Sequence, residues 1–211
     1  MASKSFKFWT RDDVQKTFNL NRIYEGFEAL TTWLKADFLL SESNETLLKE
    51  LSKELFLSIE EWNEEELKVW FIGPLLRLVN FKVNNFKAFL DRSLFIIINN
   101  EKLQGNVDLC VARGNQNPEQ PYFFLHEYKP EKKRDNDPLG QLLIAMVAAQ
   151  HANNKDQKVY GCYVTGRYWF FVILDDKNYT VSNSYDATDF EDLKIILNAL
   201  FYVKEQLKKI P

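Results

Sequence analysis

Two long apolar runs, each carrying an acidic residue, constrain the fold of this chain most strongly. Residues 102–113 and 121–130 are rich in Leu, Val, Phe and Tyr, which favours β-strands. Side chains alternate along a strand, so Glu127 and Lys129 share one face of the second run with apolar neighbours. A carboxylate and an ammonium at the end of an apolar strand cost desolvation free energy unless another group compensates them. A divalent cation shared with Asp108, on the first run, would provide that compensation.

The order of these residues resembles the PD-(D/E)XK nuclease-like superfamily. An Asp on one strand is followed by Glu-x-Lys on the next strand and then by a helix, which begins at Asp137 and carries Gln141 one turn in. The resemblance covers about residues 64–175. The sequence departs from the superfamily at two positions. Val107 stands where the motif that names the superfamily has Pro, and Ala145 stands where a subset of members has Tyr.

The resemblance implies an α/β fold of restriction-endonuclease type, with a central mixed sheet flanked by helices. It also implies a nuclease that hydrolyses DNA with a magnesium ion, for which manganese can substitute. Asp108 and Glu127 would hold the ion, and Lys129 would orient or activate the attacking water. Gln141 is a further catalytic candidate, because its amide could bind a phosphate or a metal-bound water, although a simple capping role fits it equally well. Members often carry an extra acidic residue on the first core helix, a place that Glu64 takes here.

The helix pattern supports Glu64 as a metal-site candidate. Asn63 and Glu66 have the spacing of a capping box, so we expect a helix that continues to about Val79 with a kink caused by Pro74. At 3.6 residues per turn, Glu64 falls on the apolar face of this helix and Glu66 points away. A purely structural role, in which its negative charge stabilises the helix N-terminus, fits Glu64 equally well.

Charged residues indicate a local rather than a global contact with nucleic acid. Lys132, Lys133 and Arg134 follow the Glu-x-Lys strand and are candidates for binding nucleic acid, although a solvated loop fits them equally well. The whole chain has 27 Lys and Arg against 30 Asp and Glu, a net charge of −3, so it lacks an overall positive field. DNA is the expected partner and RNA a less favoured one.

Composition favours a globular protein in a reducing compartment. The 211 residues are 45% hydrophobic, enough for a sizeable core. Cys110 and Cys162 lie in apolar runs without the paired spacing of a zinc site, so we expect buried thiols. Residues 1–7 lack the apolar segment of a secretory signal and no run is long enough to span a membrane. We therefore expect a cytoplasmic protein without a membrane partner.

We predict one domain over residues 1–211, with a helical N-terminal extension over residues 1–60 and the nuclease-like core over residues 61–211. The core should run as helix, strand hairpin, Glu-x-Lys strand, helix, two or three strands, and a C-terminal helix. The N-terminal helices offer a surface for a second copy of the chain or for another protein.

Alternative functions stay open. An inactive domain of the same fold could bind nucleic acid or a protein, and a nuclease directed at RNA fits the same residues. A pure interaction domain would instead hold the acidic residues and the lysine as a buried ion pair. If the two carboxylates repel each other in the metal-free protein, Asp108→Asn should keep or raise the stability.

Overall fold

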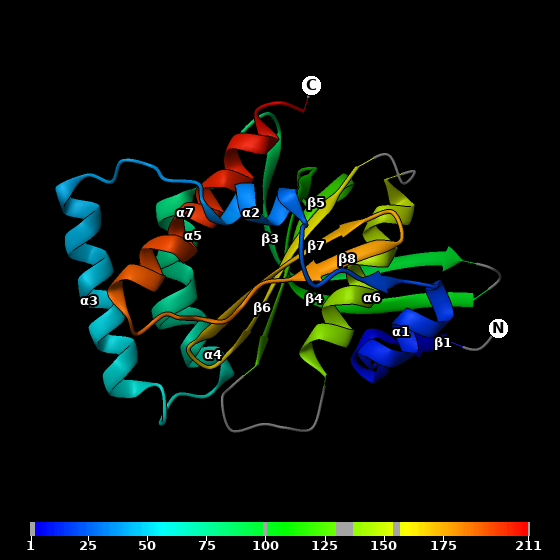
Figure 1. Cartoon of the computed structure of the whole chain (residues 1–211), viewed down its shortest axis with the longest axis horizontal. Helices are drawn as coiled ribbons and strands as arrows, with labels where there is room; N and C mark the ends of the chain where they lie inside the picture. The colour runs from blue at the N-terminus through cyan, green and yellow to red at the C-terminus, as the bar shows by residue number, and fades with distance from the viewer. Residues whose placement is uncertain (1–2, 99–100, 130–136, 154–156, 211) are drawn as a thin grey trace.

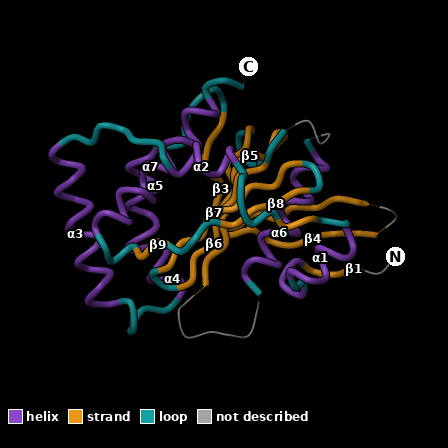
Figure 2. Tube along the Cα trace, viewed as in Figure 1, coloured by secondary structure: helices purple, strands orange, loops and turns teal. Residues whose placement is uncertain are grey.

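A computed structural model describes residues 3–98, 101–129, 137–153 and 157–210. Within these ranges nine strands form one mixed sheet with helices on both faces (Figure 1; Figure 2). The prediction of an α/β protein with a mixed central sheet is confirmed. No helix in the described ranges is both long enough and apolar enough to cross a membrane.

Helices and strands mostly come in runs along the chain. The strands are β1 (Ser3–Ser5), β2 (Asn21–Arg22), β3 (Phe86–Ile98), β4 (Glu101–Arg113), β5 (Glu119–Lys129), β6 (Val159–Thr165), β7 (Tyr168–Asp175), β8 (Asn178–Val181) and β9 (Tyr185–Asp186). The helices are α1 (Arg11–Phe18), α2 (Glu28–Leu34), α3 (Glu42–Ser58), α4 (Glu64–Leu67), α5 (Gly73–Val79), α6 (Pro138–Ala152) and α7 (Phe190–Leu207). A 3-10 turn, η1 (Phe6–Phe8), follows β1, and a π-helical turn, η2 (Lys68–Ile72), joins α4 to α5.

The centre of the sheet matches the predicted order of strands. The sheet runs β1-β4-β5-β6-β7-β8-β2, with β3 paired to β4 and β9 paired to β7. β3 and β4 form the predicted antiparallel hairpin, and β5 is antiparallel to β4. β5 and β6 are parallel, so the chain between them must cross back along the sheet, and it does so through α6. The predicted helix after the Glu-x-Lys strand is therefore confirmed.

Buried side chains form two cores, one on each face of the sheet. In β4, Leu109 and Val111 belong to the core that includes residues of α3, α5 and α7, whereas Cys110 and Ala112 belong to the core that includes α6. α6 is apolar around most of its circumference because it is covered by the sheet on one side and by α1 on another. Both cysteines are buried, as predicted, and burial raises the pKa of the Cys110 thiol to about 12.

The first sixty residues differ from the predicted helical extension, because they also contribute strands. β1 pairs in parallel with β4, and β2 pairs in parallel with β8. α1 packs on α6, and α3 packs on α7 (Figure 1). Strands of two and three residues are too short to show a period of two in the sequence, so the pattern could not reveal them. The N-terminal segment is thus built into the sheet and both helical layers.

The helix that begins after Asn63 contains a widened turn. Asn63 and Glu66 form the predicted capping box. The backbone N–H of Gly73 donates to the carbonyl oxygen of Lys68, five residues back rather than four. Pro74 has no N–H to donate, so the regular ladder is interrupted at this point. The predicted kink is therefore a π turn that begins at Lys68.

Gly140→Ala should destabilise the protein, although alanine is normally favoured over glycine within a helix by about 1 kcal/mol. A Cβ at Gly140 would lie 2.5 Å from both the backbone nitrogen of Arg11 and the carbonyl oxygen of Trp9. Backbone atoms cannot move aside as a flexible side chain does. We expect the free energy of unfolding to fall by roughly 1–3 kcal/mol, measured by denaturant titration. An increase in stability would contradict this close packing of the N-terminal segment on α6.

Candidate functional site

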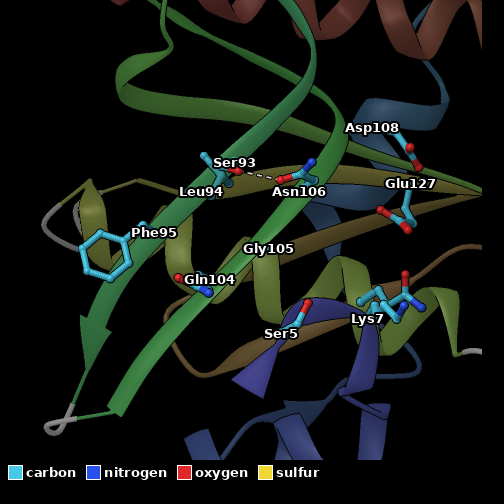
Figure 3. A pocket seen from close by; sticks show the side chains of 11 residues that line it. Ser5, Lys7, Ser93, Leu94, Phe95, Gln104, Gly105, Asn106, Asp108 and Glu127 are labelled. Carbon is cyan, nitrogen blue, oxygen red and sulfur yellow. Dashed lines mark hydrogen bonds between the residues drawn. The ribbon is translucent and has the colours of Figure 1, made fainter. Parts of the chain in front are cut away.

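The two carboxylates predicted from the sequence lie on adjacent strands at one pocket. Asp108 is in β4 and Glu127 is in β5, each next to the Leu109–His126 pair that ends the β4–β5 ladder. Both line a pocket of about 590 Å³, and Figure 3 shows the two carboxylates at the same end of it. The Glu127 residue is only 7% exposed. The structure therefore brings together the two residues predicted as metal ligands.

Asp108 is held by one hydrogen bond at each carboxylate oxygen. Its Oδ2 accepts from the backbone N–H of Tyr128 over 2.8 Å, and its Oδ1 accepts from Lys68 Nζ over 2.9 Å. The first bond lies just beyond the last backbone pair between β4 and β5, so the side chain of Asp108 continues the connection between the two strands. The carboxylate thereby links β4, β5 and the helix that carries Lys68.

Lys68 is a charged residue of this site that no sequence motif marked. Its Nζ lies 2.8 Å from Glu64 Oε1, 2.9 Å from Asp108 Oδ1 and 3.3 Å from Glu65 Oε1. Burial lowers the pKa of Lys68, but the hydrogen bonds and charges of Glu64 and Asp108 outweigh burial and raise it above its usual value. Lys68 is therefore charged at neutral pH. The spacing of four residues from Glu64 was a local signal, whereas the approach of Asp108 is visible only in the fold.

Glu64 reaches the site through Lys68. Its carboxylate shares the Lys68 ammonium with Asp108, and its side chain is 29% exposed. Glu66 instead accepts a hydrogen bond from the backbone N–H of Asn63. Glu64 thus pairs with a lysine that contacts β4, whereas Glu66 serves the capping box.

Gln141 gives the pocket a buried amide. The residue lies in the first turn of α6, is 5% exposed, and lines the same pocket as Asp108 and Glu127. Its Nε2 has no hydrogen-bond partner among the described atoms. A buried amide nitrogen without an acceptor costs about 1–3 kcal/mol. An oxygen atom of a ligand or of a water in the pocket would satisfy it.

The rest of the pocket follows the β3–β4 hairpin. Figure 3 shows it extending from the carboxylates past Asn106 and Gln104 to Phe95, with Ser5 and Lys7 on its other side. Phe95 is 57% exposed, and Lys7 is the basic residue of this lining. No motif marked Lys7 in the sequence, because only the pairing of β1 with β4 brings the N-terminus to the hairpin.

The other predicted site residues lie wholly or partly outside the described region. The backbone of Lys129 is in β5, opposite Thr165 of β6, but its side chain lies outside the described atoms. Lys132, Lys133 and Arg134, the predicted contacts to nucleic acid, fall outside the described residues.

The chemistry of the site suits a hard cation. No group of three or more His, Cys, Asp or Glu side chains in the described residues is arranged to hold a metal ion. Asp108 and Glu127 nevertheless offer carboxylate oxygens, the ligands that Mg²⁺ and Mn²⁺ prefer. Between Glu64 and Asp108 a cation is already present, the ammonium of Lys68. The carboxylate oxygens of the site fit a divalent ion, and the contacts to Lys68 show that these carboxylates attract positive charge.

Asp108→Asn should lower the stability of the metal-free protein, contrary to the expectation from the sequence. The carboxylates are not left to repel each other, because Lys68 neutralises Asp108. An asparagine would remove that charge and could not accept from both Lys68 and Tyr128 through two oxygens. We expect a loss of roughly 1–3 kcal/mol in denaturant titrations with a chelator present.

Asp175→Asn is the matched control for this experiment. Asp175 lies on a strand, as Asp108 does, and also pairs with a lysine, Lys158, but its side chain is 45% exposed. An exposed pair contributes about 0–1 kcal/mol. Equal effects of the two substitutions, or a gain in stability from Asp108→Asn, would contradict the structural role of Asp108.

No protein-family model matches this chain, and no curated protein matches it significantly. The resemblance to the PD-(D/E)XK superfamily therefore rests on the sequence motif.

Proposed function

We propose that this protein is a nuclease with a restriction-endonuclease-like core that hydrolyses DNA phosphodiester bonds in the presence of magnesium or manganese. The observation that carries the proposal is the convergence of Asp108, Glu127 and Gln141 on one pocket. Further support comes from the order of elements, in which a strand hairpin, the Glu-x-Lys strand, a crossover helix and a parallel strand follow one another.

Asp108 and Glu127 are the proposed ligands of the metal ion, and Glu64 is the proposed outer acidic residue. Two carboxylates leave room for waters and for a phosphate oxygen in the coordination sphere of a hard ion. When bound, the ion supplies charge stabilisation at the phosphate and lowers the pKa of a bound water. Because Glu127 is largely buried, bulk water would be excluded from its side of the metal site.

Gln141 and Lys129 are the proposed groups that act on the phosphate. The unpartnered Nε2 of Gln141 would donate to a phosphate oxygen or to the attacking water. Lys129, two positions after Glu127 on the same strand, would stabilise the negative charge that develops on the phosphate in the transition state. Both roles need a hydrogen-bond donor, which the ammonium of Lys129 and the amide nitrogen of Gln141 provide.

Contacts to DNA are proposed to be local. The net charge of −3 gives no general attraction to a polyanion, so the binding must come from basic residues near the pocket. Lys7 lines the pocket, and Lys132, Lys133 and Arg134 follow the Glu-x-Lys strand in the sequence.

An inactive domain of the same fold, acting as a nucleic-acid-binding or protein-interaction subunit, is the second candidate. The observation that favours it is the ammonium of Lys68, which already pairs with both Glu64 and Asp108 as in a permanent structural ion pair. A calorimetric titration with Mn²⁺ separates the two candidates, because only the nuclease takes up the ion.

Substitutions on β5 test the proposed activity. Glu127→Gln and Lys129→Ala should each lower the rate of Mg²⁺-dependent DNA cleavage by roughly two orders of magnitude or more, the effect of removing one positioned charged group. Lys129→Ala should keep its affinity for Mn²⁺ within a few-fold, because Lys129 is not a proposed ligand. The measurement is a single-turnover cleavage assay with linear and supercoiled DNA.

Glu119→Gln is the control, since Glu119 is an exposed acidic residue at the opposite end of the same strand. The Glu119→Gln variant should cleave DNA at the same rate as the unmodified protein. Full activity in Glu127→Gln would rule out this active site, and full activity in Lys129→Ala would remove Lys129 from the mechanism.

A further inference from the structure

Three acidic side chains converge on one ammonium at this site. Lys68 Nζ contacts Glu64, Glu65 and Asp108, and the Lys68 side chain is 24% exposed. The three partners differ in their surroundings. The Asp108 side chain is 16% exposed and lines the pocket, whereas the Glu65 side chain is 79% exposed. The ammonium thus lies between an inner and an outer carboxylate.

The inner contact occupies the oxygen that a metal ion would need. Asp108 Oδ2 is engaged by the backbone N–H of Tyr128, and Asp108 Oδ1 by Lys68. The bond to the backbone belongs to the connection between β4 and β5 and cannot be given up without disturbing the sheet. Oδ1 is therefore the oxygen whose partner is a side chain that can move, and an ammonium beside it disfavours the close approach of a divalent ion because like charges repel.

Glu65 is an alternative partner for the Lys68 ammonium. Lys68 and Glu65 are three residues apart on one helix, and their charged atoms are already 3.3 Å apart. A lysine has a flexible stem of four carbons, so the ammonium can leave Asp108 while the backbone of the π turn stays in place. It would then pair with Glu65 and gain contact with water.

We propose that Lys68 is the counter-cation of Asp108 in the metal-free protein and that a divalent metal ion binds by displacing its ammonium from Asp108 toward Glu65. This inference rests on the proposed function, because it takes Asp108 as a metal ligand. Lys68 is then a positioning residue that sets the metal affinity. The apparent dissociation constant equals the intrinsic one divided by the fraction of molecules whose Asp108 is free of Lys68. If that fraction is about one tenth, Lys68 weakens metal binding about tenfold.

Calorimetric titration of the full chain with Mn²⁺ tests this competition. Lys68→Met keeps the apolar stem and removes the charge, so it should bind Mn²⁺ about tenfold more tightly than the unmodified protein. Lys68→Arg keeps the charge and should stay within about threefold of the unmodified affinity. Lys194→Met is the matched control, since Lys194 also pairs with an exposed glutamate three residues away on a helix, Glu191. It should not change the affinity.

Each outcome of the titration has a distinct meaning. Equal affinities in all four proteins would overturn the competition while leaving the proposed function in place. Weaker binding in Lys68→Met would also overturn it, because Lys68 would then be holding the carboxylates ready for the metal. Absence of Mn²⁺ binding in every protein, the unmodified one included, would overturn both the inference and the proposed function.

Glu65→Gln provides a second measurement that leaves Lys68 and Asp108 intact. The variant removes the outer partner of the displaced ammonium, so Mn²⁺ binding should weaken by about threefold, the scale of an exposed ion pair. Unchanged affinity would contradict the proposed movement of Lys68. This result decides the inference if Lys68→Met does not fold, which its thermal melting curve in a chelator would show.

Discussion

The carboxylate of Asp108 is the contact on which the rest of the site depends. One of its oxygens accepts the backbone N–H of Tyr128, and the other accepts the ammonium of Lys68. Three parts of the chain that are distant in sequence are thereby joined: the β3–β4 hairpin, the Glu-x-Lys strand and the helix with the π turn. The ladder between β4 and β5 sets the position of Glu127 relative to Asp108, and the contacts of Lys68 link Glu64 to Asp108.

Charge compensation determines what such a site can do. Glu64, Asp108 and Glu127 lie at or near a pocket with little exposure, where unpaired carboxylates would cost free energy. Lys68 supplies one positive charge, and a divalent ion would supply two. The proposed nuclease and the proposed inactive binding domain therefore differ in one property, namely whether Lys68 can be exchanged for an ion.

Much of the fold could be predicted because its signals are local. The apolar alternation of β3 to β5, the Asp137 cap before α6 and the capping box of Asn63 and Glu66 each lie within a few neighbouring residues. β1 and β2 were missed because two or three residues carry no periodicity. Lys68 was missed as a site residue because its contact to Asp108 joins residues 40 positions apart. Spacing along the helix could place Glu64 beside Lys68 but could not bring either to β4.

A crystal structure of the protein soaked in Mn²⁺, with the ion located by its anomalous scattering, tests the central claim most directly. We expect a peak held by the carboxylates of Asp108 and Glu127, the oxygen ligands that a hard divalent ion prefers. We also expect that Lys68 Nζ has moved away from Asp108 toward Glu65. A site without manganese, in which Lys68 still donates to Asp108, would contradict the account and leave a structural ion pair in place of a metal centre.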